Sequence, residues 1–116
     1  MNRLKSRTDF LRAQKGVRRV TPSLTLESCA SPTPGALRVG FTASRKIGNA
    51  VLRNRAKRRL REAARAVLPL SGRGGHDYVL VARPGTLSRP FPSLVEDLAA
   101  ALAAAHLRLD AKGDFS

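Results

Sequence analysis

The sequence is poor in cysteine, in aromatic residues and in acidic residues. A single cysteine, Cys29, excludes an internal disulfide and favours a reducing compartment such as the cytoplasm. Because there are only four phenylalanines, one tyrosine and no tryptophan, the core must consist mainly of leucine, valine and alanine. No stretch approaches the roughly 18 uninterrupted apolar residues of a membrane span, and the start MNRLKSRTDF has no apolar run that would predict a signal peptide.

Positive charge is in large excess, and it is concentrated in two segments. The 22 Lys and Arg residues against eight acids give a formal net charge of +14. Residues 1–20 carry +6 and residues 45–65 carry +8, while the rest of the chain is neutral. Such a distribution produces a directional field, which favours a polyanionic partner. Nucleic acid is the leading candidate, and an acidic membrane surface is the second.

The pattern of apolar residues predicts an α+β fold, in which helices pack on a small sheet within a single domain over 1–116. Helices are expected over 7–14, 50–68 and 93–107, and strands over 23–29, 37–44 and 77–82. The turn SPTPG between the first two strands predicts that they pair as a hairpin. The segment RPGTLSRPFP is expected to be irregular, and the tail over 109–116 is expected to be frayed.

The helix over 50–68 is strongly amphipathic. Its core face is predicted to consist of Leu52, Ala56, Leu60, Ala63 and Val67. One flank is a contiguous polar and basic stripe about 18 Å long, made of Arg53, Asn54, Lys57, Arg58, Arg61 and Arg65. The only acid on this helix, Glu62, could pair with Arg58 or Arg59. Most charge runs are solvated helix faces, but this one lacks the interleaved acids that would relieve its repulsion, so nucleic-acid binding is favoured.

Composition alone does not distinguish DNA from RNA. One cysteine and two histidines exclude a zinc finger, and no heptads follow the basic helix as in a basic zipper. The aromatic pair of an RNA-recognition-motif sheet is also absent.

The stretch LRVGFTASRKIGNAVLRNRAKRRLR, residues 37–61, closely resembles the signature of the protein subunit of bacterial ribonuclease P. That family carries a hydrophobic strand followed by S-[KR]-K-x-G-x-A-V-x-R-N-[RK]-x-[KR]-R, and the match here is ungapped. The flanking stretches RLKSRTDF and DYVLVARPG also resemble the family's first helix and last strand. The resemblance implies a left-handed β-α-β crossover around the basic helix, which is rare.

The resemblance also implies a function. Ribonuclease P removes the 5′ leader of precursor tRNA, and its RNA subunit performs the chemistry with Mg²⁺. The protein is then a non-catalytic, monomeric cytoplasmic subunit that contacts that RNA and holds the single-stranded leader. No catalytic or metal-binding residue is expected on the protein, because neither the histidines nor Cys29 has a clustered partner.

Site residues follow from the motif positions. Facing the catalytic RNA and the near part of the leader are Arg53, Asn54, Arg55, Lys57, Arg58 and Arg61, and Arg65 extends the stripe. Arg45 and Lys46 are expected to contact phosphates. Lining the leader cleft are Phe10 on the first helix and Arg38, Thr42 and Ser44 on the second strand. Phe10 could instead anchor its helix in the core. Where the family often has a second aromatic this chain has Gln14, so stacking is weaker or Val17 substitutes.

Two alternatives stay open. The chain could be a ribosomal or translation-associated RNA-binding protein, since a related left-handed crossover occurs in such proteins. It could also be an enzyme that acts alone on RNA, although no nucleophile and base are arranged for that.

Overall fold

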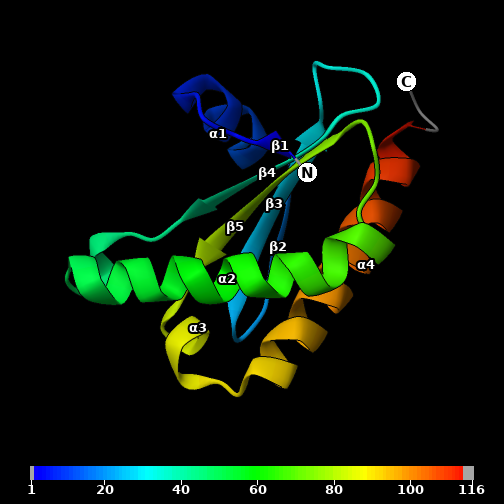
Figure 1. Cartoon of the computed structure of the whole chain (residues 1–116). Coiled ribbons are helices and arrows are strands. Elements are labelled where there is room, and N and C mark those ends of the chain that lie inside the picture. Colours follow the sequence, from blue (N-terminus) through cyan, green and yellow to red (C-terminus); the bar gives the residue numbers. More distant parts are fainter. Residues whose placement is uncertain (1, 114–116) are drawn as a thin grey trace.

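The structure is a mixed five-stranded sheet with helices on both faces, and it matches the expected α+β class (Figure 1). This computed structural model describes residues 2–113. The strands are β1 (Asn2–Arg3), β2 (Val17–Val20), β3 (Leu24–Ala30), β4 (Leu37–Thr42) and β5 (His76–Ala82). The helices are α1 (Arg7–Gln14), the 3-10 turn η1 (Arg45–Ile47), α2 (Ala50–Ser71), α3 (Pro84–Ser88) and α4 (Phe91–Gly113).

Helices α1 and α2 begin where local capping chemistry predicts. The Ser6 hydroxyl accepts a hydrogen bond from the Asp9 backbone N–H at 3.1 Å, and the Asn49 side chain accepts one from the Leu52 N–H at 3.0 Å. Asp9 adds an acid in the first turn of α1, which the helix dipole favours. These caps set the start of the two helices that carry the candidate site.

The strand order is β1-β4-β5-β3-β2, so the predicted hairpin between the first two long strands is wrong. β5 lies between β3 and β4 and pairs antiparallel with the first and parallel with the second. An alternating strand shows which face it buries but carries no information about its neighbour, which is decided by contacts distant in sequence. β3 instead forms its hairpin with β2, a strand that the sequence pattern did not reveal.

The connection from β4 through α2 to β5 has the rare hand that the resemblance implied. In Figure 1, α2 lies in front of the sheet and both parallel strands point to the lower left. When this view is turned so that the two strands point upward and α2 stays in front, β5 lies to the left of β4, which makes the crossover left-handed. In Figure 1, α2 crosses in front of the sheet, where it contacts both β4 and β5, and its N-terminal turns reach past the strand ends.

One face of the sheet carries the main core. Leu26, Tyr78 and Leu80 from the sheet pack against Leu60 of α2 and Leu98 of α4, and all five are fully buried. The opposite face is covered over only part of its area, by α1 and the smaller cluster of Leu4, Ala13, Cys29 and Val79. The rest of that second face is open to solvent, which matters for the site.

Both long helices extend beyond the predicted ends. α2 continues through Pro69 to Ser71, because a proline in the last turn gives up one hydrogen bond without ending the helix. α4 runs to Gly113, so the expected frayed tail is helical over 109–113, and residues 114–116 lie outside the described part. The segment expected to be irregular contains α3. No helix within residues 2–113 is both long enough and apolar enough to cross a bilayer.

Candidate nucleic-acid interface

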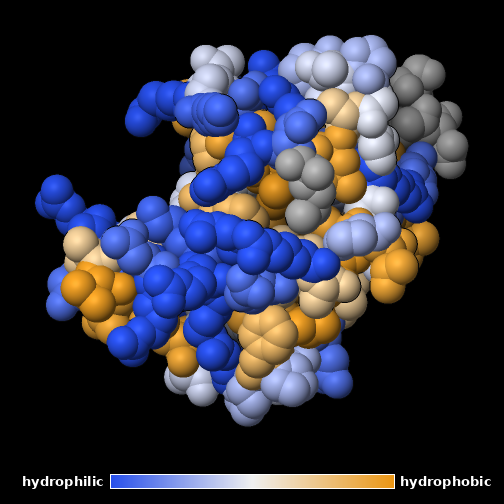
Figure 2. All heavy atoms as spheres, viewed as in Figure 1, coloured by the Kyte–Doolittle hydropathy of each residue, from blue (hydrophilic) through white to orange (hydrophobic). Residues whose placement is uncertain are grey.

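Helix α2 presents the predicted basic stripe at the surface. Its buried positions include Ala56, Leu60, Ala63 and Val67, as the helical wheel predicts, and the stripe runs along their flank. Figure 2 shows the hydrophilic side chains of this helix gathered in a band across the front of the molecule. Exposed on the stripe are Asn54, Arg58 and Arg65, and half-buried are Arg53, Lys57 and Arg61; Arg55 is exposed on another side.

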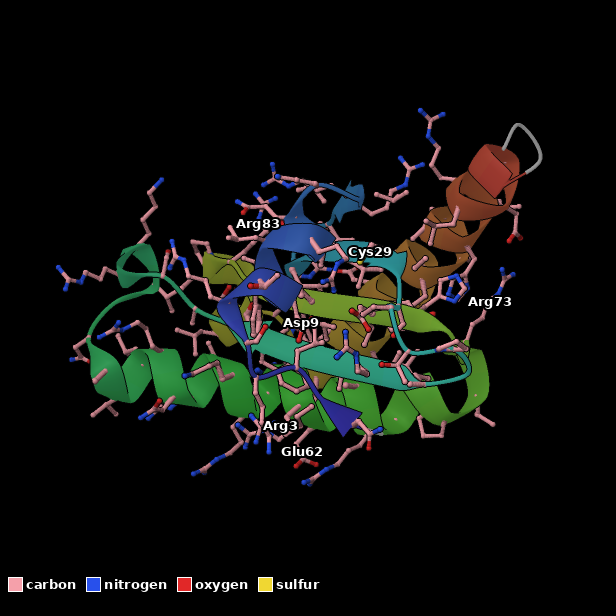
Figure 3. The ribbon with its side chains drawn as sticks, turned by 90° about the horizontal axis from the view of Figure 1, so that it is seen from above. Arg3, Asp9, Cys29, Glu62, Arg73 and Arg83 are labelled. Atoms are coloured by element: carbon pink, nitrogen blue, oxygen red, sulfur yellow. The ribbon has the colours of Figure 1, made fainter. Side chains whose placement is uncertain are left out.

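The stripe borders the edge of the sheet formed by β1 and β4. The Arg61 guanidinium carbon lies 5.9 Å from the centre of the Phe41 ring, a cation–π distance that orients the arginine along β4. Arg3 on β1 lines the same hollow with Arg61 and Arg65, and Figure 3 shows it at this edge beside Glu62. The sequence pattern did not single out Arg3, because a two-residue strand carries no detectable periodicity.

Few acids neutralise this stripe. Glu62 bonds Arg65 at 2.9 Å, one turn along the helix, rather than either of the predicted arginines. Within residues 2–113, no ion pair reaches Arg53, Lys57 or Arg58. The Nε atoms of Arg53 and Arg61 are buried without a hydrogen-bond partner. Unrelieved repulsion and unpaired donors together favour an anionic ligand on this flank.

Arg59, in the same run of basic residues, has a structural role. Its Nε donates to the Thr86 carbonyl at 2.7 Å and its Nη2 to the Arg89 carbonyl at 2.5 Å, so it ties α2 to α3 and the segment that follows. One basic residue in the run is therefore structural, while its neighbour Arg58 is exposed.

On the open face of the sheet lies a cleft of about 630 Å³. Four predicted residues line it: Phe10, Thr42, Ser44 and Lys46. Gln14, which stands where the family often has a second aromatic, lines the cleft too, and the prediction missed the others, which are Arg7, Leu11, Arg18, Glu27, Val79 and Val81. Arg7 and Leu11 lie near Phe10 on the same helix, so helical spacing could have identified them. The other missed residues come from β2, β3 and β5 and reach the cleft only through the strand order, which no local sequence signal reveals. Arg7, Arg18 and Lys46 place positive charge around the cleft, while two valines and Phe10 provide apolar surface.

The register of the sheet fixes the floor of this cleft. One row across four strands reads Arg18, Glu27, Val79 and Gly40, and the next row reads Val20, Thr25, Val81 and Thr42. In each row the side chains point to the same face. Phe10 lies on Gly40, where an added Cβ would come within 2.6 Å of its ring. Glycine at this position therefore lets the aromatic ring rest directly on the sheet.

Phe10 accordingly has both roles that the sequence left open. It is half-buried and packs against the small cluster under α1, so it anchors the helix. It also lines the cleft, where its ring is available for stacking. Gln14 lines the cleft too, but Val17 is 5% exposed in the main core on the other face and does not replace the missing aromatic.

Arg38 lies under α1 and does not line the cleft. Its Nε and Nη2 donate to the two carboxylate oxygens of Asp77 at 2.8 and 2.7 Å, and Nη2 also reaches Asp9 at 3.2 Å. The hydrogen bond to Asp77 is the main cause that raises the pKa of Arg38. Burial would raise the pKa of Asp9, but hydrogen bonds from Arg12 and the charge of Arg38 bring it below its ordinary value. This network attaches α1, one wall of the cleft, to β4 and β5.

The cleft continues toward the start of α3. A second hollow of about 420 Å³ shares Arg18, Ser44, Lys46 and Val81 with it and adds Thr25 and Arg83. Ser44 also caps η1 by accepting from the Lys46 N–H at 3.3 Å, which places Arg45 and Lys46 between the cleft and α2. Arg45 is exposed there. The open sheet face and the basic stripe are thus joined by one short turn.

The histidines lie apart from this surface. His106 is buried within α4, which continues past the predicted helix end at 107, and its Nε2 lies 2.7 Å from the Tyr78 hydroxyl. Burial and the nearby Arg73 and His76 lower the pKa of His106. Among the described residues there is no group of three His, Cys, Asp or Glu side chains placed to hold a metal ion.

The chain is similar to known proteins over nearly its whole length. The family model described as Ribonuclease P matches residues 1–106. A ribonuclease P protein component from Ruegeria pomeroyi is 53% identical over 106 residues, covering 89% of this chain and 85% of that protein. One from Gluconacetobacter diazotrophicus is 44% identical and covers 92% and 93%.

Solved structures agree. The RNase P protein of Staphylococcus aureus superposes with a TM-score of 0.74 at 28% identity, covering 90% of this chain and 95% of that one. The protein from Thermotoga maritima gives 0.73 at 27% identity, with 88% and 96% covered. The match of sequence and fold over these lengths favours this family over the ribosomal alternative. The chain belongs to the ribonuclease P protein component family, the protein subunit of a ribonucleoprotein that cleaves tRNA precursors.

Proposed function

We propose that this protein binds two RNA elements with two neighbouring surfaces. The basic stripe of α2 contacts the catalytic RNA of ribonuclease P, and the cleft on the open sheet face holds the single-stranded 5′ leader of precursor tRNA. The observation that carries the proposal is the cleft itself, in which cations surround an apolar and aromatic floor. Single-stranded nucleic acid is bound in this way, with phosphates on the cations and bases on the apolar surface.

The stripe suits a folded RNA better than a single strand. Arg53, Lys57 and Arg61 follow one another at four-residue spacing along a rigid helix, so their separations are fixed. Guanidinium groups bind phosphates in two-pronged geometry, and Asn54 adds a donor and an acceptor for a base edge or a ribose. Arg45 and Lys46, on the turn between the two surfaces, are placed for phosphates at the junction of leader and catalytic RNA.

In this proposal the protein positions RNA and the RNA subunit carries the chemistry together with the Mg²⁺ that the family resemblance implies. No residue is assigned to hold that metal, because the described residues offer no suitable group of ligands. The protein acts as a monomer within the ribonucleoprotein, in the bacterial cytoplasm where tRNA precursors are processed.

The experiment is precursor-tRNA cleavage at low Mg²⁺ by a bacterial ribonuclease P RNA, with and without this protein. Strong stimulation that increases with leader length is expected, because the cleft adds affinity for leader nucleotides. A well-folded protein that gives no stimulation would overturn the proposal. Stimulation that is equal for substrates with a long leader and with a leader of a single nucleotide would leave only the stripe as an RNA contact. Cleavage by the protein alone would instead support the independent-enzyme alternative.

A further inference from the structure

The sheet ends at β2 in an edge that no other strand covers within residues 2–113. The Thr21 N–H donates to the Leu24 carbonyl at 2.8 Å, which makes these two residues a hydrogen-bonded pair of the antiparallel ladder. Bonded and non-bonded pairs alternate along such a ladder, so the backbone groups of Arg18 and Val20 point away from β3. The edge therefore offers the N–H and C=O groups of both residues to an added strand.

A groove of about 340 Å³ follows this edge on the side of α4. Its lining consists of four successive residues of the chain and one residue of α4: Gly16, Val17, Arg18, Arg19 and Arg108. Because side chains alternate along a strand, Arg19 lies on the same face of the sheet as Val17, which is buried in the main core, while Arg18 lies on the cleft face. A hollow lined by successive residues of one strand suits an extended chain better than a single compact ion.

The groove is positively charged, and its cations are not neutralised. In the part of the chain that the structure describes, no ion pair reaches Arg18, Arg19 or Arg108. The Nε atom of Arg19 is buried without a hydrogen-bond partner, and a buried donor of this kind calls for an acceptor from a ligand. On the cleft face of the same edge, Val20 is 56% exposed and offers apolar surface.

We propose that the β2 edge binds an extended acidic segment of another protein, which adds a strand to the sheet. Acidic and apolar residues alternate in this segment, so its carboxylates reach Arg19 and Arg108 on one face while its apolar side chains contact Val20 on the other. Main-chain hydrogen bonds supply affinity, and the two arginines supply selectivity. The inference does not depend on leader binding, because the described lining of the cleft includes neither Arg19 nor Arg108.

Two other occupants fit the edge less well. A second copy of β2, paired antiparallel, would place Arg18 or Arg19 opposite its own copy, and like charges on paired strands are destabilising. RNA would place phosphates on the arginines, but the outward carbonyls of Arg18 and Val20 would then face phosphate oxygens, which also only accept hydrogen bonds. An acidic strand satisfies the N–H groups, the C=O groups and the arginines together.

The first test is the binding of a designed peptide to the whole chain. The probe is a fluorescein-labelled peptide TEVEVEVT, in which glutamate and valine alternate, and fluorescence anisotropy measures its affinity. Arg19→Gln should weaken binding about tenfold, the size expected for one hydrogen bond between charged groups. The matched control is Lys5→Gln, which removes an exposed cation just after β1 at the opposite edge and should leave the affinity unchanged. Equal effects of the two substitutions would show that only net charge matters and would overturn the proposal.

A second test separates strand pairing from charge. Two versions of the peptide carry methyl groups on alternate backbone nitrogens, and the version whose methyl groups face β2 cannot pair. It should bind about tenfold more weakly than the other, although both have the same charge. Val20→Pro removes one outward N–H, which an edge strand tolerates, and should also weaken binding while thermal melts verify folding. Equal affinity of the two methylated peptides would overturn strand addition. A uridine decamer that loses as much affinity as the peptide in Arg19→Gln would identify the edge as an RNA contact instead.

Discussion

The Arg38 guanidinium holds the fully buried Asp77 carboxylate through two hydrogen bonds of 2.8 and 2.7 Å, and the same group reaches Asp9 on α1. Asp77 belongs to β5 and Arg38 to the neighbouring strand β4, where they are register partners. One arginine therefore joins two strands and the helix that walls the cleft.

Breaking this pair should destabilise the protein strongly. Arg38→Ala leaves a buried carboxylate without its partner, which costs about 3–5 kcal/mol of the free energy of unfolding. The matched control is Arg73→Ala, which breaks the exposed Arg73–Asp110 pair of 2.7 Å and should cost far less, because solvent screens an exposed pair. Urea unfolding followed by circular dichroism measures both. Equal effects of the two changes would show that Arg38 is not structural and would return it to the list of RNA contacts.

Substitution of two adjacent arginines on α2 should affect different properties, RNA binding in one case and stability in the other. Arg58→Ala removes an exposed cation and should weaken binding to the catalytic RNA, with the slope of log K against log salt smaller in magnitude by about 0.7–0.9. Arg59→Ala removes two hydrogen bonds to backbone carbonyls, so it should lower unfolding stability by about 1.5–3 kcal/mol. Filter binding at several salt concentrations and denaturant unfolding distinguish them. Loss of folding in Arg58→Ala would argue against its surface role.

Adding one methyl group at Gly40 should displace Phe10. Because the new Cβ would lie 2.6 Å from the ring, Gly40→Ala must push the aromatic side chain off the sheet and reduce affinity for precursor tRNA with a leader. In a Phe10→Ala background the same substitution meets no ring and should cost little. A double-mutant cycle on leader-dependent affinity measures this coupling. Additive effects of the two changes would contradict the contact.

Stability should fall in mild acid because of His106. Its pKa is lowered in the folded protein, first by burial, so the unfolded chain binds the proton more readily. The stability that depends on neutral His106 is therefore complete above its ordinary pKa near 6.5 and is lost as the pH falls through and below that value. His106→Gln keeps an acceptor for the Tyr78 hydroxyl and does not titrate. Melting temperatures between pH 5 and 8 should depend less on pH in this variant, and an unchanged dependence would contradict the assignment.

Local chemistry made part of the fold and site predictable. The caps at Ser6 and Asn49, the buried face of α2 and its basic flank all follow from residues within a few positions of one another. Strand pairing did not follow, since β5 is more than 30 residues after β4 and yet separates it from β3. Because the sequence did not reveal that β5 lies beside β4, it did not show Asp77 as the partner of Arg38, and Arg38 was expected in the cleft.

Several site residues were missed for the same reason, because the sequence did not reveal which strands pair. Arg18 and Glu27 face each other only because β2 and β3 form the hairpin that alternation did not reveal, and Arg83, just after β5, lines the hollow that adjoins the cleft. The stretch VRRV of β2 is short and lies at the sheet edge, so its apolar and polar residues do not alternate. Sequence therefore located the helix that carries the stripe, while the floor of the cleft required the tertiary structure.

The most direct test of leader binding is the affinity of the reconstituted holoenzyme for precursor tRNA with a leader, compared with mature tRNA. The cleft predicts tighter binding of the precursor, and Phe10→Ala should remove about 1–3 kcal/mol of that difference by deleting the stacking surface. Affinity for mature tRNA should not change in this variant, because no leader is present to occupy the cleft. Equal affinity of the wild-type holoenzyme for both tRNAs, or a Phe10→Ala loss of the same size for both, would contradict a cleft that holds the leader.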